Sequence, residues 1–128
     1  MPSYQKIVVV GNLGQDPELR YTPQTSAAVC SFSVAYNEKF KASNGDLVEH
    51  KAWFRVSAWG KIAESCNQYL KKGSLVVVEG TLISDDETGG PRLWKKKDGS
   101  PGASFEIKAQ NVRFLSRVEG KPEEQSEF

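Results

Sequence analysis

The segment that most constrains the fold of this chain runs from Lys51 to Gly60, with the sequence KAWFRVSAWG. In an extended strand, successive side chains point to opposite faces of a sheet. The small and apolar side chains of the segment then share one face, which carries Ala52, Phe54, Val56 and Ala58. Such a face is typical of a strand that covers a hydrophobic core on one side. The segment therefore predicts a β-rich fold that leaves the other side of this strand free.

The opposite face of the same segment combines aromatic rings with cations. It carries Lys51, Trp53, Arg55, Ser57 and Trp59. A hydrophobic core does not favour the cations, and a face that only meets water does not usually carry two tryptophans. Flat aromatic rings beside positive charges are what a flexible, negatively charged chain of bases requires. The pattern predicts a surface that binds single-stranded nucleic acid.

Length and composition fit one soluble domain with a real core, since the chain has 128 residues, 38% of them hydrophobic and 26% charged. No apolar run approaches the ~20 residues of a membrane-spanning helix, and the N-terminus lacks the layout of a secretory signal. Cys30 and Cys66 have no metal-like spacing, so they are interpreted as small buried residues in a reducing compartment. We expect a cytoplasmic protein without a metal or other cofactor.

The formal net charge is only +1, but the charge is unevenly distributed. Residues 118–128 hold four glutamates against Lys121, a net charge of −3, whereas residues 1–117 hold 16 Lys/Arg and 12 Asp/Glu, a net charge of +4. Binding to nucleic acid should then depend on local cations and stacking more than on a large positive field. We expect a folded domain over residues 1–117 and a short acidic, disordered tail over residues 118–128.

Short strands follow one another along the chain, with one helix between them. The five predicted strands cover residues 6–11, 27–36, 51–59, 75–80 and about 103–115, with extended structure also at 18–21 after the first of them, and the helix covers about 62–70. This order predicts an all-β OB-fold, a five-stranded Greek-key barrel with one helix between strands 3 and 4.

Several local features of this fold are predicted as well. The β-branched runs at 6–11 and 75–80 are expected to be buried on both faces. Residues 37–50 and 83–102 are expected to be polar loops, and Gly73 is expected to be the C′ residue that ends the helix. A phase shift in the last strand predicts a β-bulge near Asn111.

Five blocks of the sequence, in order and at compatible spacing, resemble the bacterial single-stranded DNA-binding protein family. They are Gly11–Tyr21, Trp53–Val56, Trp59–Glu64, Tyr69–Ser74 and Val78–Gly80. The resemblance extends from about Lys6 to Leu115. It implies an OB-fold, usually a homotetramer, that coats single-stranded DNA in the bacterial cytoplasm and nucleoid during replication, recombination and repair.

Four aromatic residues are the candidates for base stacking. Trp53 and Trp59 come from the alternating strand, whereas Trp94 and Phe40 each lie among lysines in an expected loop. The resemblance implies the same four positions, although the family commonly has Trp where this chain has Phe40 and Phe where it has Trp59. Each residue also fits a bland role as an apolar anchor for its loop or strand. Three further aromatics have the phase of core residues and are interpreted as packing: Phe32, Phe105 and Phe114.

The candidates for phosphate contacts are the cations near these aromatics: Arg55, Lys51, Lys61, Lys72, Arg92, Lys95, Lys96 and Lys97. Arg55 is the strongest of them, because it shares its strand face with both tryptophans. The three consecutive lysines equally fit a solvated loop. Arg20 fits either a phosphate contact or a local ion pair, and the sequence does not separate the two.

An enzyme is not indicated. His50 is the sole histidine, and no arrangement of Ser, Cys and His suggests nucleophilic catalysis. The acidic run Asp85–Glu87 is interpreted as a solvated turn rather than a metal site. The segment Gly11–Gly14 does not satisfy a phosphate-binding fingerprint.

The C-terminus ends in acidic residues followed by phenylalanine, with Glu127 and Phe128 last. Family members usually end in an acidic, phenylalanine-terminated tip that recruits replication and repair enzymes. The chain therefore allows either partner docking through Glu127 and Phe128 or an incidental acidic end.

Two other functions stay open. One is an OB-fold adaptor of the replication or primosome machinery, which should have lost the stacking aromatics that this chain keeps. The other is an RNA-binding OB domain, because no residue here is seen to read a 2′-hydroxyl and the preference for DNA comes from the resemblance.

Overall fold

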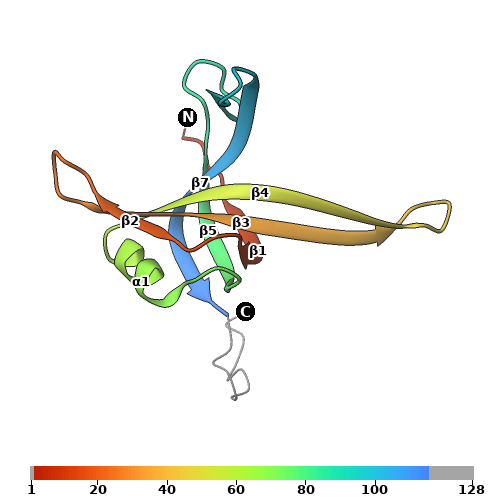
Figure 1. The fold of residues 1–128 in the computed structure, drawn as a ribbon, viewed down its shortest axis with the longest axis horizontal. Coiled ribbons are helices and arrows are strands. Elements are labelled where there is room, and N and C mark those ends of the chain that lie inside the picture. Colours follow the sequence, from red (N-terminus) through yellow and green to blue (C-terminus); the bar gives the residue numbers. More distant parts are fainter. Residues whose placement is uncertain (1, 116–128) are drawn as a thin grey trace.

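The computed structural model describes residues 2–115 of the chain (Figure 1). It has seven strands and one helix in the described part, in the following order: β1 (Ile7–Leu13), β2 (Glu18–Tyr21), β3 (Ala28–Lys41), β4 (Leu47–Trp59), α1 (Lys61–Tyr69), β5 (Leu75–Ile83), β6 (Arg92–Lys95) and β7 (Pro101–Phe114). The predictions for residues 118–128, including Glu127 and Phe128, lie outside the described residues.

Five of the strands close into a barrel. The sheet runs β1-β5-β7-β4-β3, and β3 returns to β1 through the pairs Asn12↔Ala35 and Leu13↔Val34. The pairings are antiparallel except for β4 with β7, which is parallel. β2 adds to the outer edge of β3, and β6 pairs only with β7, so both lie off the barrel. The helix follows the third barrel strand, and the predicted OB-fold is confirmed.

Two glycines allow the barrel strands to come close together. A Cβ atom on Gly11 would lie 2.2 Å from the backbone oxygen of Ala35, where β1 meets β3. A Cβ atom on Gly80 would lie 2.1 Å from the backbone oxygen of Lys108, where β5 meets β7. No side chain fits at either distance, so the barrel closes in this form only with glycine at both positions.

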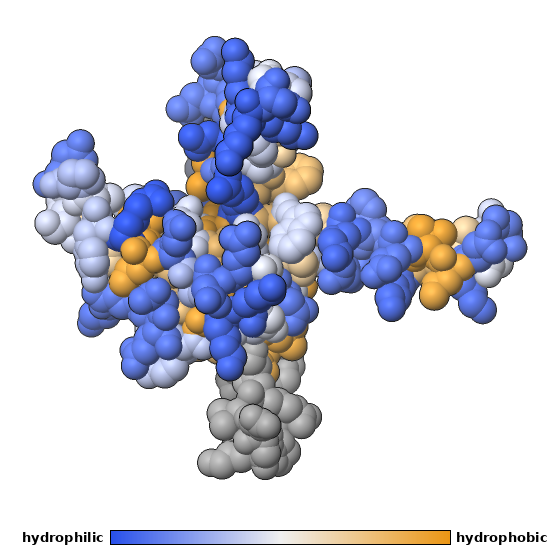
Figure 2. Space-filling view, in the orientation of Figure 1, coloured by the Kyte–Doolittle hydropathy of each residue, from blue (hydrophilic) through white to orange (hydrophobic). Residues whose placement is uncertain are grey.

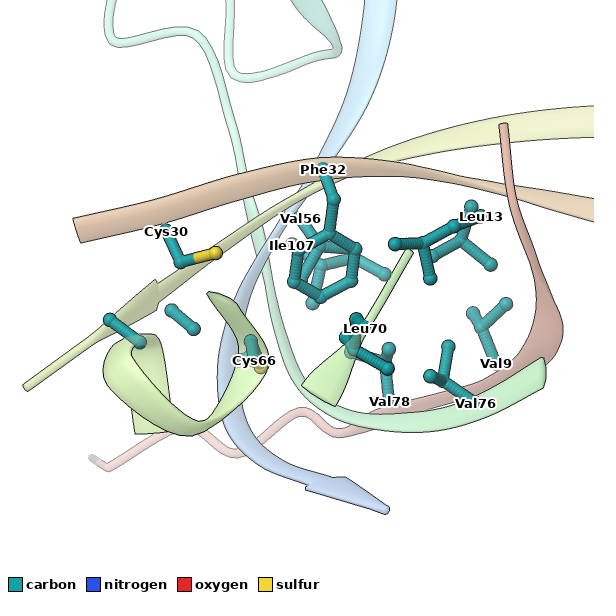
Figure 3. Packing of buried hydrophobic residues seen from close by; sticks show 14 of the residues in the cluster. Val9, Leu13, Cys30, Phe32, Val56, Cys66, Leu70, Val76, Val78 and Ile107 are labelled. Atoms are coloured by element: carbon teal, nitrogen blue, oxygen red, sulfur yellow. The ribbon is translucent and has the colours of Figure 1, made fainter. Parts of the chain in front are cut away.

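The barrel interior is filled mainly by small and β-branched side chains, together with Leu13, Phe32 and Leu70 (Figure 3). At most 1% of the surface is exposed for five of the largest core residues: Ile107, Val34, Val56, Val76 and Val78. Helix α1 covers one end of this core with Ala63 and Cys66, both fully buried. Since the core alternates along each strand, one face of each barrel strand points inward.

The prediction that both faces of β1 are buried is wrong for the single chain, because one face is exposed. Val9, Gly11 and Leu13 point into the barrel, whereas Val8 and Val10 are 52% and 38% exposed. A barrel has only one inner face, and no other part of residues 2–115 covers the outer face of β1. The corresponding prediction for 75–80 is confirmed for Val76, Val77 and Val78.

Strand β7 has the predicted bulge. Its register with β5 changes from Gly80↔Ala109 to Glu79↔Asn111, which leaves Gln110 as the extra residue. Phe32 is buried as predicted, but the burial predicted for Phe105 and Phe114 is wrong, because they are 48% and 37% exposed.

The reason is the length of β7, which runs past both ends of the core. Ile107 and Ala109 occupy its buried middle. Phe105 lies just beyond the last β5 partner, Glu106, and Phe114 packs at the surface against Tyr69, with ring centroids 6.0 Å apart.

Two predicted loops contain strands instead. β3 and β4 continue far outside the barrel and join through residues 42–46, so they form one long hairpin arm (Figure 1). Residues 83–102 contain β6, which pairs with the start of β7 to form a second hairpin. Both segments leave the core, so their strands lack the buried alternation that identifies a strand in a sequence.

The end of the helix also differs from the prediction. Helix α1 ends at Tyr69, and Leu70 is already extended, with its N–H donating to Cys66 O. Gly73 does have a positive φ of 90°, but it belongs to the turn that leads into β5 and is not the C′ residue. Within residues 2–115, no helix is both long and apolar enough to span a membrane.

The contrast between Ile107 and Phe105 gives a direct test of the core. Ile107→Ala removes a fully buried side chain and should lower the free energy of unfolding by about 2–5 kcal/mol. Phe105→Ala should cost less, about 1–2 kcal/mol, because Phe105 is already 48% exposed. Urea unfolding measures both. An equally large loss for Phe105→Ala would contradict the position of this ring outside the core.

Candidate nucleic-acid interface

The alternation predicted for β4 is confirmed. Trp53, Arg55 and Trp59 are exposed on one face, with Lys51, and Ser57 is half-buried there. On the other face Val56 and Ala58 are buried, whereas Phe54 is partly buried and packs against the core. The unbroken pairing with β3 fixes this orientation, because a slip by one residue would turn the tryptophans inward.

An open groove of about 770 Å³ lies between the β3–β4 arm and the β6–β7 hairpin. We call it the stacking groove. Its walls include Lys51, Trp53, Arg55, Trp94, Ser104 and Phe105. Trp53 and Trp94 are 48% and 42% exposed, and the ammonium Nζ of Lys51 lies 5.8 Å from the centre of the Trp53 ring. The structure thus brings together two tryptophans that lie 41 positions apart in the sequence.

Trp94 reaches the groove from a strand and not from a loop. It lies on β6 directly opposite Gly102 on β7, and the short hairpin ends in a turn in which Lys96 N–H donates to Ser100 O at 2.8 Å. Lys95 ends β6, and Lys96 and Lys97 lie in the turn, all three exposed. The hairpin therefore fixes the backbone of these lysines and leaves their side chains exposed to solvent.

Phe105 is an aromatic residue of the groove that sequence reasoning missed. Its ring packs against Phe54 with centroids 5.7 Å apart, and the rest of it faces the groove. The alternation of β7 correctly gives the face of Phe105. Alternation does not say how far along the strand the core extends, so no sequence signal separated Phe105 from the buried Ile107.

Trp59 lies apart from this groove. It is 45% exposed at the end of β4, six residues from Trp53 and hence roughly 20 Å along the strand. It lines neither of the two grooves on this face. Lys61, which begins α1, is exposed close to it in the chain.

Phe40 lies on the arm, in β3, and is 48% exposed. Its partner across the hairpin is Val48. Along β3, Phe40 shares a face with Tyr36, whereas Ala35, the partner of Trp53, lies on the other face. In the hairpin register, Phe40 and Trp53 therefore point to opposite faces. Figure 2 shows the arm mainly hydrophilic, with one hydrophobic patch near its tip.

A second groove, of about 320 Å³, carries most of the arginines. We call it the arginine groove. Its cations are Arg20, Arg55 and Arg92, and serines line it between them: Ser31, Ser33 and Ser57. Three carboxylates also line it: Asp16, Glu18 and Glu106. Arg92 Nη1 lies 3.5 Å from Glu106 Oε1, so these two side chains form an ion pair. Arg55, Ser33 and Gln15 belong to both grooves, so the two form one continuous surface.

Lys72 lines neither groove, although it contacts Asp16 of the arginine groove. It is exposed in the turn after α1, where its backbone N–H donates to Asp16 Oδ1 at 2.8 Å. Of the predicted phosphate candidates, the structure therefore gathers Lys51, Arg55 and Arg92 at the grooves. Lys95, Lys96 and Lys97 lie beside them on the β6–β7 hairpin.

Residues that often carry chemistry have structural roles here. Burial raises the pKa of the Cys30 thiol, and burial, with a smaller effect of Cys30, raises the pKa of Cys66 to about 12. Both are neutral thiols inside the core, as predicted. Asp85 accepts backbone N–H groups of Glu87 and Thr88, and these hydrogen bonds lower the pKa of its carboxyl group. Across residues 2–115, no cluster of His, Cys, Asp or Glu could hold a metal ion.

Comparisons with known proteins show the family of the chain and match its fold. The model of the single-strand binding protein family matches residues 4–115. The chain belongs to this family. A member from Chlorobaculum tepidum, single-stranded DNA-binding protein 2, is 37% identical over 127 residues, which cover 99% of this chain and 81% of the relative.

A further relative and a solved structure are also similar to the chain. The single-stranded DNA-binding protein of Neisseria meningitidis serogroup A is 40% identical over 113 residues, which cover 88% of this chain but only 60% of the relative. A solved structure, the Plasmodium falciparum SSB complex with ssDNA, superposes with a TM-score of 0.73 at 26% identity. The match covers 91% of this chain and 98% of that one.

Proposed function

We propose that this chain binds single-stranded DNA without sequence preference and protects it during replication, recombination and repair. One observation carries the proposal: Trp53 and Trp94 stand exposed on two walls of one open groove, beside Lys51 and Arg55. Every base offers a π face to such rings, so stacking there is tolerant of sequence. The family of the chain and its likeness to an SSB complex with ssDNA support DNA as the ligand. The proposal is one of binding, without a catalytic step.

The proposed stacking residues are Trp53, Trp59, Trp94 and Phe40, to which the groove geometry adds Phe105. The proposed phosphate contacts are Arg55, Lys51, Lys61, Lys72, Arg92, Lys95, Lys96 and Lys97. The arginine groove continues the surface from Arg55 to Arg20, which supports a phosphate contact over a local ion pair for Arg20. Serine hydroxyls between the arginines add hydrogen-bond donors for phosphate oxygens.

The spread of the aromatics limits the path of the DNA. Phe40 on β3 is paired with Val48 on β4. Val48 and Trp59 are 11 residues apart along β4, so Phe40 and Trp59 are separated by roughly 36 Å along the strand. One strand that contacts all four aromatics must follow β4 through the stacking groove. It must also pass around the arm, because Phe40 faces away from Trp53 in the hairpin register.

Titration of intrinsic tryptophan fluorescence tests the proposal. Oligo-dT, duplex DNA of the same length and oligo-U are compared at low and high salt. Oligo-dT should quench strongly and duplex little, and high salt should weaken the binding of oligo-dT, since each proposed phosphate contact releases a counterion. Equal quenching by duplex, or none by any ligand, would contradict the proposal and favour the protein-interaction adaptor.

Alanine variants test the residues by the anisotropy of labelled oligo-dT. Trp53→Ala and Trp59→Ala should each weaken binding by roughly 1–3 kcal/mol while the fold is kept. Tyr69→Ala is the control, because Tyr69 is 64% exposed, lines neither groove and lies on α1, not on the β4 face that carries Trp53 and Trp59. A folded double variant, Trp53→Ala with Trp59→Ala, that bound as tightly as wild type would exclude the stacking face.

We also propose that the protein is a homo-oligomer. Among residues 2–115, the part of β1 from Ile7 to Gly11 pairs with β5 only, which leaves its other edge open. The exposed Val8 and Val10 lie along this edge. An open strand edge beside apolar side chains favours pairing with a second copy. The number four comes from the family resemblance.

Sedimentation at micromolar concentration tests the oligomer. Wild type should sediment as a tetramer, and Val8→Asp should shift it to smaller species, since a charge would be buried in the contact. A monomeric wild type would contradict the proposal.

The proposal also covers the cellular location of the protein and its protein partners. We place it in the cytoplasm, associated with the nucleoid. We also propose that Glu127 and Phe128 dock replication or repair proteins, as the acidic, phenylalanine-terminated end supports. Recovery of partners that is unchanged in a pull-down without these two residues would overturn the docking.

A further inference from the structure

Each tryptophan of the stacking groove lies against a glycine of a neighbouring segment. We infer that Gly14 and Gly102 are positioning residues, which hold the rings of Trp53 and Trp94 in the orientation that receives a base. The inference rests on the proposed function. It concerns two residues that contact the indoles and not the DNA.

Gly102 lies under the face of the Trp94 ring. A Cβ atom on Gly102 would be 2.9 Å from each of three consecutive ring atoms, Cε2, Cζ2 and Cη2. Equal distances to three bonded atoms put that position above the ring plane and not beside its edge. Carbon atoms prefer about 3.5–4.0 Å, so the indole rests on the bare backbone of β7. Its inner face is covered, and its outer face is open to the groove.

Gly14 meets the edge of the Trp53 ring. A Cβ atom there would be 2.6 Å from Cζ3 and 2.7 Å from Cη2, but 3.8 Å from Cε3. The outer edge of the six-membered ring therefore stops at the glycine. Gly14 is itself fixed to the sheet, because its N–H donates to Ser33 O at 3.1 Å. This contact sets how far the indole extends across the face of β4.

Backbone strain does not explain either glycine. Neither Gly14 nor Gly102 has a positive φ, unlike Gly45, Gly60, Gly73, Gly89 and Gly99. Alanine can thus adopt the backbone conformation at both positions, and the atoms nearest to the added methyl group belong to the indole in each case. A methyl group would lift Trp94 from β7 or push Trp53 sideways. Binding sites lose function when their groups move by about 0.5 Å or 10–20°.

Both variants should remain folded. β6 pairs only with β7 and lies off the barrel, so a shift of Trp94 leaves the core untouched. Trp53 is 48% exposed and has space to move into the groove. The effect of each substitution should therefore fall on binding.

The first test compares Gly14→Ala, Gly102→Ala and the control Gly90→Ala by anisotropy with labelled oligo-dT. Gly90 also lacks a positive φ, and its added Cβ atom would meet only Thr88 Oγ1 at an ordinary 3.7 Å. The two groove variants should each bind at least about fivefold more weakly than wild type, and the control should bind as wild type does. Wild-type affinity in Gly14→Ala and Gly102→Ala would overturn the inference.

A double-mutant cycle separates positioning of the ring from a general effect on the hairpin. Gly102→Ala should weaken binding in wild type but change it less than about twofold when Trp94→Ala is already present. Gly14→Ala should behave in the same way with Trp53→Ala. Equal losses in both backgrounds would show that the glycines act without the indoles and would overturn the inference.

The outcome for wild type separates the two levels of the account. If wild type does not bind oligo-dT, the proposed function fails. If wild type binds and the glycine variants bind equally well, only the role of Gly14 and Gly102 fails.

Discussion

The unbroken antiparallel register between β3 and β4 is the constraint on which the rest of the structure depends. Every residue of β4, from Leu47 to Trp59, has a partner on β3. Inside the barrel this register places Val56 in the core and Arg55 on the outer face. Outside the barrel the same pairing continues as the arm, which forms one wall of the stacking groove. A shift by one residue would exchange the core and the binding surface at once.

The barrel was predictable because its strands must bury one face. Alternation in β3 and β4 and the apolar run of β5 identify strands without any structure, and the bulge in β7 shows as a change of phase. What lies outside the core was not predictable in this way. The arm and β6 are held by backbone hydrogen bonds between polar strands, and a polar strand looks like a loop in a sequence. Likewise, the outer face of β1 has the same β-branched residues as its inner face, so composition does not distinguish them.

In the candidate site, too, the residues on barrel strands were predictable and the contacts made outside the barrel were not. Trp53 and Arg55 were predicted from their phase, which depends only on the strand that carries them. The meeting of Trp53 with Trp94 depends on where a hairpin outside the barrel folds, which no local pattern states. Phe105 was assigned to the core because alternation gives a face and not a depth. The glycines that contact the two indoles carry no side chain at all, and only the three-dimensional contact distinguishes Gly102 from a glycine in a turn.

The central claim is that bases stack in the groove between the arm and the β6–β7 hairpin. Ultraviolet crosslinking of wild-type protein to oligo-dT, followed by mass spectrometry of the joined peptides, tests it most directly. The account predicts crosslinks at Trp53, Trp94 and Phe105, and none at Tyr69 or Phe114, which form an aromatic pair outside both grooves. Crosslinks concentrated at Tyr69 and Phe114, with none in the stacking groove, would contradict it.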